Sequence, residues 1–231
     1  MQPSDNFRQQ RRFLNFARGL VRLPVPGEGP LDYLVPEARW RELLGRAPDP
    51  AAWLMGISNA TGVYFFPSRE WVLKLLRYLH RLRVNRVLEA GAGRGYLTAA
   101  LAALCRDAGL AFKAVDRGDG EFVSELPSHP LVARGDAVAA VFDFRPQVVI
   151  YAWPPPGQSM AAICQAPFLH YLIFIGEAGG GATGDPRDWQ TLSHRDSPAL
   201  SRGARGRTGP ETHRVTIFYG GAGAKGHKGH K

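Results

Sequence analysis

Three glycines on alternate positions, Gly91, Gly93 and Gly95, are the clearest candidates for a ligand-binding turn in this sequence. An acid, Glu89, stands two residues before them, and a second acid, Asp116, stands 21 residues after Gly95. Glycine has no Cβ, so a backbone turn built from it can approach a ligand closely. A helix that starts at such a turn favours negatively charged groups at its N-terminus. The spacing therefore predicts a nucleotide-binding turn with a carboxylate on either side.

The segments around the glycines predict the elements that hold this turn. Apolar Val87 and Leu88 predict a short strand before it, the Ala- and Leu-rich residues 96–105 predict a helix after it, and a second apolar run predicts a strand that ends in Asp116. Strand, glycine turn, helix and strand with a terminal acid form a nucleotide-binding βαβ unit. A dinucleotide fingerprint would need a further glycine where the chain has Tyr96, which disfavours a dinucleotide.

The pattern E-x-G-x-G-x-G, with an acid at the end of the next strand, resembles the first motif of the class I S-adenosylmethionine-dependent methyltransferases. The resemblance extends over about residues 62–219. It implies a Rossmann-like fold and S-adenosylmethionine as the cofactor. A glycine turn without a ligand and an NAD-type site remain alternatives.

The resemblance also implies a role for each residue of the motif. The three glycines would pass under the methionine and ribose of the cofactor, and Glu89 would organise the loop and the cofactor's amino group. Asp116 would accept both ribose hydroxyls, as two carboxylate oxygens can. Asp136, after the third strand, would meet the adenine amino group, or would be an ordinary turn aspartate. The implied cofactor site comprises Glu89, Gly91, Gly93, Gly95, Tyr96, Asp116 and Asp136.

The fourth strand is followed by Trp153 and three prolines, Pro154 to Pro156. Amino-group methyltransferases often carry an Asp or Asn before Pro-Pro at this place, so the sequence departs from the family where an acceptor nitrogen would be aligned. The prolines stiffen the loop at the carboxyl end of the sheet, where such folds bind ligands. Trp153 could stack on a flat substrate or lie near the sulfonium, or it could be a packing residue.

A glycine-rich loop after the fifth strand carries the remaining candidates for catalysis, Glu177 and Asp185, with Thr183 between them. Either acid could accept a proton from a nucleophile or orient it, and the glycines would let the loop close over a substrate. Asp185 precedes Pro186, so it could instead cap a helix. His170 and His194 are weaker candidates.

Alternating apolar strands and helices predict the α/β class, with a doubly wound, mostly parallel sheet. Residues 1–50 are expected to form an N-terminal helical extension, 51–220 a methyltransferase-like domain and 221–231 a flexible basic tail. Residues 51–66 are mixed and turn-rich, and residues 197–210 lack strand character. Further strands are expected at 131–134, 147–153, 171–176 and 213–219, and helices at 36–44, from 67 or 68 through Leu79, at 121–126, 160–167 and 186–193.

The net charge of +9 is concentrated toward the C-terminus, where residues 195–231 hold eight Lys and Arg against two acids. The Gly-rich tail either is simply solvated or holds anionic partners such as nucleic acid. Near the N-terminus, Phe13, Phe16 and Leu20 lie largely opposite the arginines of a basic amphipathic helix. Such a helix can dock on its own domain, lie on a membrane surface or serve as a transit peptide.

Cys105 and Cys164 lie in apolar helical patterns, so buried thiols in a reducing, cytoplasmic compartment are expected rather than a disulfide or a metal site. No run of 18 apolar residues predicts a membrane span. The resemblance implies a methyltransferase in which a small-molecule or macromolecular nucleophile attacks the methyl group in line with the sulfonium. A catalytically inactive binding module and an RNA- or ribosome-associated methyltransferase are the alternatives.

Overall fold

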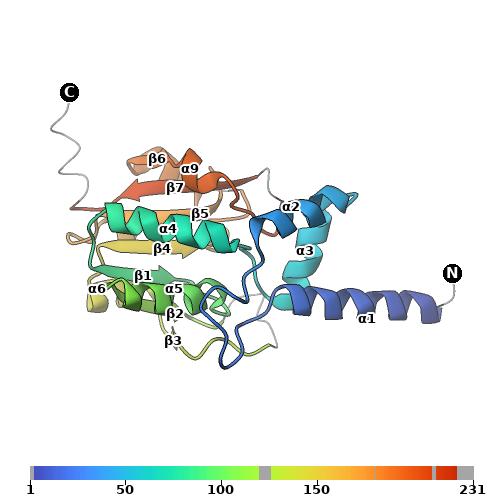
Figure 1. The fold of residues 1–231 in the computed structure, drawn as a ribbon. Helices are drawn as coiled ribbons and strands as arrows, with labels where there is room; N and C mark the ends of the chain where they lie inside the picture. The colour runs from blue at the N-terminus through green and yellow to red at the C-terminus, as the bar shows by residue number, and fades with distance from the viewer. Residues whose placement is uncertain (1–2, 120–125, 180, 210–211, 223–231) are drawn as a thin grey trace.

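The fold is built on a seven-stranded sheet with the order β3-β2-β1-β4-β5-β7-β6 (Figure 1). It is seen in a computed structural model that describes residues 3–119, 126–179, 181–209 and 212–222. Strands β1 to β5 are parallel, and β7 runs antiparallel to both of its neighbours. The predicted doubly wound, mostly parallel sheet is therefore confirmed. The strands are β1 Arg86–Ala90, β2 Ala111–Asp116, β3 Val132–Arg134, β4 Val148–Ala152, β5 Tyr171–Glu177, β6 His194–Asp196 and β7 His213–Tyr219.

The centre of the sheet contains the topological switch point. β1 pairs with β2 on one side and with β4 on the other, so the chain winds outward in opposite directions from these two strands. In open α/β sheets, ligands bind outside the carboxyl ends of the strands at such a point. The glycine turn follows β1, Asp116 ends β2 and Trp153 follows β4. The connectivity thus brings the main predicted site residues to one edge of the sheet.

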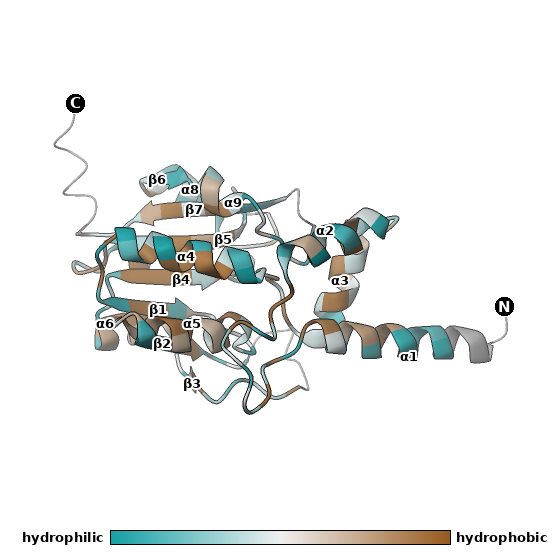
Figure 2. Cartoon of the chain, in the orientation of Figure 1, coloured by the Kyte–Doolittle hydropathy of each residue, from teal (hydrophilic) through white to brown (hydrophobic). Residues whose placement is uncertain are grey.

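Two apolar layers cover the sheet. On one face, α4 (Arg69–Arg81) and α5 (Tyr96–Asp107) pack against residues such as Val148 and Ile173. On the other face, α6 (Ala137–Phe144) and α7 (Ala161–Cys164) pack against residues such as Val149 and Leu172. Successive strand residues point to opposite faces, so strands covered on both faces are apolar throughout. Figure 2 shows this as apolar colour along the central strands.

The N-terminal extension consists of α1 (Pro3–Leu20) and α2 (Glu37–Arg46), followed by α3 (Pro50–Thr61). Ala17 is fully buried, and the Phe13 ring lies so close to Gly56 of α3 that a Cβ there would be 2.9 Å from it. The C-terminal half of α1 therefore docks on α3, as one of the three alternatives for this helix expects. Its N-terminal turns project from the rest of the molecule (Figure 1).

The expectation of a mixed, turn-rich stretch over residues 51–66 was wrong for its first part, because α3 occupies Pro50–Thr61. Asp49 caps the helix by accepting a hydrogen bond from the Ala52 N–H at 3.0 Å, and Gly62 ends it with a φ of 66°. Both are ordinary helix boundary signals. The small polar residues before Gly62 mask them, since they occur in turns as well.

The elements between β5 and β7 are short. They comprise α8 (Pro186–Thr191), the three-residue strand β6 and α9 (Pro198–Ser201). The sequence pattern predicts α8 and β7 but neither β6 nor α9, because a single turn or a three-residue polar strand leaves no periodicity. The helix expected at residues 121–126 lies largely outside the described residues. Within the described part of the chain, both cysteines are buried and unpaired, and no helix combines the length and apolarity needed to cross a membrane.

Candidate functional site at the carboxyl edge of the sheet

The glycine turn is left-handed at all three glycines, with φ values of 61°, 54° and 80° at Gly91, Gly93 and Gly95. A Cβ on Gly91 would lie 2.6 Å from the Tyr151 ring, and one on Gly95 would lie 2.7 Å from Val132. A Cβ on Gly93 would meet no described atom within 4 Å. Packing thus requires glycine at the first and third positions, whereas the second leaves open space beside the backbone where a ligand could lie.

Asp116 lies next to this turn and is held by two backbone amides. The Gly93 N–H donates to its Oδ2 at 2.8 Å, and the Gly118 N–H donates to its Oδ1 at 2.7 Å. The side chain is only partly buried, and each carboxylate oxygen can accept a further hydrogen bond. The arrangement fixes a carboxylate at the switch point with acceptor capacity left for hydroxyl donors.

Glu89 is 2% exposed, and its carboxyl group contacts α5. The Thr98 hydroxyl donates to its Oε2 at 2.7 Å. Burial raises the pKa of Glu89 to about 8, against the effect of the Thr98 hydrogen bond. This hydrogen bond joins the end of β1 to α5, the helix that follows the glycines, so Glu89 stabilises the position of α5 relative to the glycine turn.

The side chain of Tyr96 lies in the core rather than on the surface of the turn. Its ring packs edge-on against Tyr33 at a centroid distance of 5.3 Å, and the Tyr33 hydroxyl donates to the Tyr96 carbonyl. Burial raises the pKa of the Tyr96 phenol, which has no hydrogen-bond partner among the described residues. The contribution of this residue to a ligand site is therefore its backbone at the start of α5, where Gly95 provides no side chain to cap the helix.

Asp136 follows β3 and caps α6, because its Oδ1 accepts a hydrogen bond from the Ala139 N–H at 3.0 Å. The preceding Gly135 N–H donates to the Asp116 carbonyl at 2.9 Å, so the ends of β2 and β3 lie side by side. Burial raises the pKa of Tyr151, below Gly91, to about 12, and Asp116 and Asp136 both add to this rise. Both aspartates are thus close enough to Tyr151 to act on its hydroxyl.

Trp153 has a φ of 57°, which is rare for a residue with a Cβ. Its Nε1–H donates to His213 Nε2 at 3.0 Å, and the two rings stack at 5.5 Å with an angle of 23°. Tyr64 packs against the tryptophan at 6.3 Å, tilted by 54°. These contacts hold an aromatic side chain in a strained backbone position at the carboxyl end of β4, and such strain is common at ligand sites.

His213 and Tyr64 are the residues of this edge that the sequence does not reveal. His213 is 1% exposed and stacks on Phe65 at 5.8 Å, and burial, followed by the charges of Arg205 and Arg214, lowers its pKa to about 3. The backbone brings these segments together. The Phe66 N–H donates to the Arg205 carbonyl at 2.9 Å, and the Arg207 N–H donates to the Tyr64 carbonyl at 3.0 Å. No local signal marks a contact between segments about 140 residues apart.

Glu177 and Asp185 both stabilise the loop in which they lie. The Glu177 carboxylate accepts the Ala182 N–H, and its own N–H donates to the Thr183 hydroxyl at 2.9 Å. Asp185 caps α8 and pairs with Arg187 at 2.6 Å, which holds the pKa of this carboxyl below its usual range. The capping alternative for Asp185 is thereby confirmed. The half-buried Glu177 carboxylate accepts a loop amide and forms no ion pair among the described residues.

The loops after β4 and β5 are joined to each other. The Gly157 N–H donates to the Gly184 carbonyl at 2.9 Å, and the Gly184 N–H donates to the Pro154 carbonyl at 3.1 Å. The structure thus brings Trp153, Glu177 and Asp185 to one pair of loops beside the glycine turn. His170 and His194 lie at the other end of the strands, since they flank the starts of β5 and β6.

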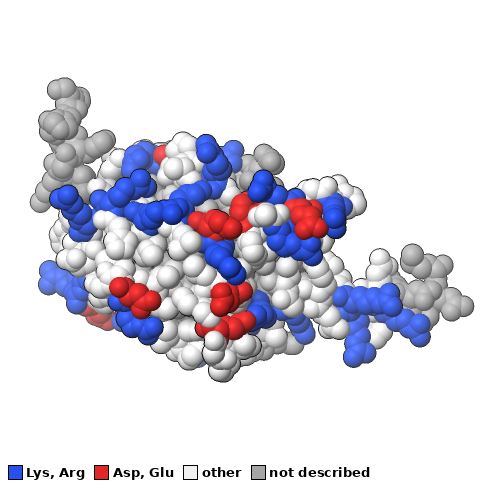
Figure 3. All heavy atoms as spheres, viewed as in Figure 1, with Lys and Arg blue, Asp and Glu red and all other residues white. Residues whose placement is uncertain are grey.

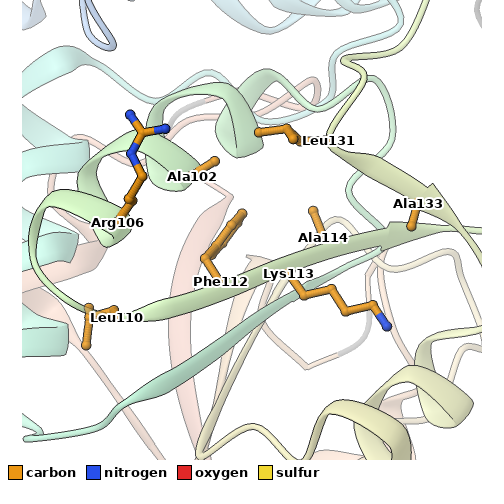
Figure 4. A pocket seen from close by; sticks show the side chains of 8 residues that line it. All are labelled: Ala102, Arg106, Leu110, Phe112, Lys113, Ala114, Leu131 and Ala133. Atoms are coloured by element: carbon orange, nitrogen blue, oxygen red, sulfur yellow. The ribbon is translucent and has the colours of Figure 1, made fainter.

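A separate hollow of about 270 Å³ lies between α5 and the strands β2 and β3 (Figure 4). Its lining is mainly alanine and leucine, with Phe112 at its centre and the charged ends of Arg106 and Lys113 at its margin. It contains neither the glycine turn nor Asp116, so it is distinct from the carboxyl-edge site. Nothing in its lining offers an acid, a hydroxyl or an imidazole for chemistry.

Neither a protein-family model nor a curated protein matches this sequence. Among solved structures, the chain is similar to a putative caffeoyl-CoA O-methyltransferase from Staphylococcus aureus, at 10% identity over 80% of this chain and 99% of that one, with a TM-score of 0.44. It is similar to the CurJ carbon methyltransferase, at 13% identity over 95% and 71% of the two chains and a TM-score of 0.43.

The human N-acetylserotonin methyltransferase, solved with SAM, matches at 10% identity over 92% of this chain and 66% of that one, with a TM-score of 0.39. At such identities and scores the likeness assigns neither an acceptor nor a mechanism. All three of these solved structures are named as methyltransferases.

Proposed function

We propose that this protein is an S-adenosylmethionine-dependent methyltransferase. The observation that carries the proposal is Asp116, whose carboxylate is fixed by the Gly93 and Gly118 amides at the switch point of the sheet. This is where a doubly wound fold binds a nucleoside. The residues fit such a ligand, because Gly93 leaves open space beside the turn and Asp116 keeps acceptor capacity for two hydroxyls.

In this proposal the cofactor is held by residues from the ends of three strands. Asp116 accepts the ribose hydroxyls, and Asp136, which follows β3, is the residue that the resemblance implies for the adenine amino group. The uncapped first turn of α5 offers amide donors to the cofactor's carboxylate. Glu89 acts through Thr98 by holding α5 against the turn. When bound, S-adenosylmethionine supplies an activated methyl group for in-line transfer to a nucleophile.

The acceptor side of the site would be formed by the joined loops. Trp153, held by His213 and Tyr64, presents an aromatic wall that suits a flat acceptor or the neighbourhood of a positive charge. Glu177 is the candidate to orient or deprotonate the nucleophile, and Asp185 fixes the loop that carries it. Methyl transfer needs little beyond such positioning, because the methyl group arrives already activated.

The test is titration calorimetry with S-adenosylmethionine and with its demethylated product. The wild-type protein is expected to bind both, and Asp116→Ala is expected to lose about 10- to 100-fold in affinity, since hydrogen bonds to a charged group contribute roughly 1.5–3 kcal/mol. Asp143→Ala, which removes an exposed carboxylate on α6, is the matched control and should bind like the wild type. Absence of binding by the wild type would refute the proposal.

A catalytically inactive module with the same cofactor site is the alternative. Binding without methyl transfer to any acceptor in a cell extract would favour it. Asp116→Ala also removes the acceptor of the Gly93 N–H, so it could destabilise the fold. An unchanged melting curve of this variant would show that a loss of affinity comes from the lost ribose contact.

A further inference from the structure

Five cations form a band on the face of the molecule that carries α4, α9 and β6. Lys74, Arg77 and Arg81 lie on α4, Arg195 lies on β6 and Arg202 follows α9. We call this set the basic strip. Figure 3 shows blue side chains running across this face from the amino edge of the sheet. The residues come from segments more than 100 positions apart, so the fold assembles the strip.

Within the described residues, none of the five cations has a carboxylate at ion-pair distance. Asp196 is the nearest acid in sequence to Arg195, and its carboxylate accepts the Thr216 hydroxyl at 2.9 Å. The Lys74 ammonium donates to the carbonyls of Ala199 and Arg202 at 3.0 and 2.8 Å. Burial lowers the pKa of Lys74, Glu37 opposes this, and the like charges of Arg202 and Arg77 lower it further. Glu37, the acid that acts on Lys74, is itself paired with Arg205, so the strip keeps an excess of positive charge.

Tyrosines are interleaved with the cations at the amino edge. The Arg195 Nη2–H donates to the Tyr78 hydroxyl at 3.1 Å, and the Arg81 guanidinium lies 6.0 Å from the Tyr78 ring. Arg195 also lines a shallow hollow with Tyr171 and Tyr219, whose rings lie 6.0 Å apart. All three tyrosines are partly exposed. One end of the basic strip thus combines arginines with aromatic rings.

We propose that the basic strip and its tyrosines bind single-stranded nucleic acid. Cations along a track neutralise successive phosphates, and aromatic side chains stack on bases that are not already stacked in a duplex. A membrane surface suits this face less well, because the most exposed large apolar side chains among the described residues, Phe7, Leu131 and Val25, lie outside α4, α9 and β6. The end of the strip that carries Arg81, Arg195 and the tyrosines lies at the amino end of the strands, away from the glycine turn, and the proposal stands without methyltransferase activity.

The test is fluorescence anisotropy of a labelled oligouridylate of about 20 nucleotides with the full-length protein at 50 to 200 mM salt. Binding is expected to weaken with salt, and a plot of log K against log salt concentration should have a slope of about −3.5 if all five cations contact phosphates. Arg81→Glu is expected to weaken binding at least about fivefold and to reduce the slope by about one. Arg41→Glu on α2 makes the same charge change outside the strip and should stay within about twofold of the wild type.

The aromatic part of the proposal has a separate variant. Tyr171→Leu is expected to weaken binding about fivefold or more with an unchanged salt slope, because it removes a stacking surface and no charge. Melting curves confirm that each variant folds. No binding of the oligonucleotide by the wild type, equal effects of Arg81→Glu and Arg41→Glu, or binding of phosphatidylserine vesicles in place of the oligonucleotide would each overturn the proposal.

Discussion

A buried carboxyl group beneath the glycine turn makes the stability of this protein sensitive to alkaline pH. Burial raises the pKa of Glu89 to about 8, above the ordinary value of 4.5 in the unfolded chain. Its contribution to stability is therefore complete below pH 4.5 and is lost as the pH rises through 8. Glu89→Gln keeps an acceptor for Thr98 and does not ionise. The variant is expected to gain stability relative to the wild type between pH 5 and pH 9, by an amount on the order of a few kcal/mol.

Urea denaturation of both proteins at the two pH values measures this difference. Glu42→Gln, which removes an exposed carboxylate on α2, serves as the control. A difference between Glu89→Gln and the wild type that is the same at pH 5 and pH 9 would show that Glu89 ionises normally in the fold.

His213 makes the stability of the protein depend on pH in the opposite direction. Burial lowers its pKa to about 3, below the ordinary 6.5, so its contribution to stability is present above pH 6.5 and is lost as the pH falls toward 3. His213→Gln keeps an acceptor for the Trp153 Nε1–H and does not titrate. The wild type is expected to lose stability relative to this variant between pH 8 and pH 5 in urea denaturation. His80→Gln, at the exposed end of α4, should leave the pH profile unchanged.

At the scale of elements, a buried ion pair connects the N-terminal extension to the loop after α9. The Arg205 guanidinium is 3% exposed, contacts both Glu37 oxygens, one of them at 2.6 Å, and lies 5.3 Å from the Trp40 ring. The same loop pairs with residues 64–66 below Trp153. The ion pair therefore links α2 to the segments that pack around Trp153 in the candidate site. The domain boundary expected near residue 50 lies between α2 and α3, but α2 stays in contact with the rest of the fold.

Glu37→Gln is expected to destabilise the protein by about 2 kcal/mol, because it leaves the Arg205 charge buried without its partner. The cost is below that of a fully buried pair, since Glu37 is partly exposed. Glu42→Gln on the same helix breaks only exposed pairs and should leave the stability close to that of the wild type. In the double variant Arg205→Met with Glu37→Gln, urea denaturation should recover part of the loss. An equal loss of stability in Glu37→Gln and Glu42→Gln would show that the Glu37–Arg205 ion pair does not stabilise the fold.

For the whole molecule, the sequence predicts what local patterns encode. An apolar strand, a glycine turn, a helix and a second strand that ends in Asp116 all lie within residues 86–116, and the sheet class follows from the alternation of strands with helices. His213, Tyr64 and the basic strip depend on segments that meet only after folding. The sequence places most of the net positive charge from residue 195 onward, whereas the structure adds Lys74, Arg77 and Arg81 of α4 to Arg195 and Arg202. No periodicity encodes such a meeting.

The hydrogen bonds between the loops after β4 and β5 also determine how these two loops move. Because Gly157 donates to Gly184 and Gly184 donates to Pro154, neither loop can swing away without breaking bonds held by the other. Their amide protons should consequently exchange with solvent through one shared opening event, at a common free energy. A ligand that orders one loop would slow amide exchange in both, so the two loops would open and close together.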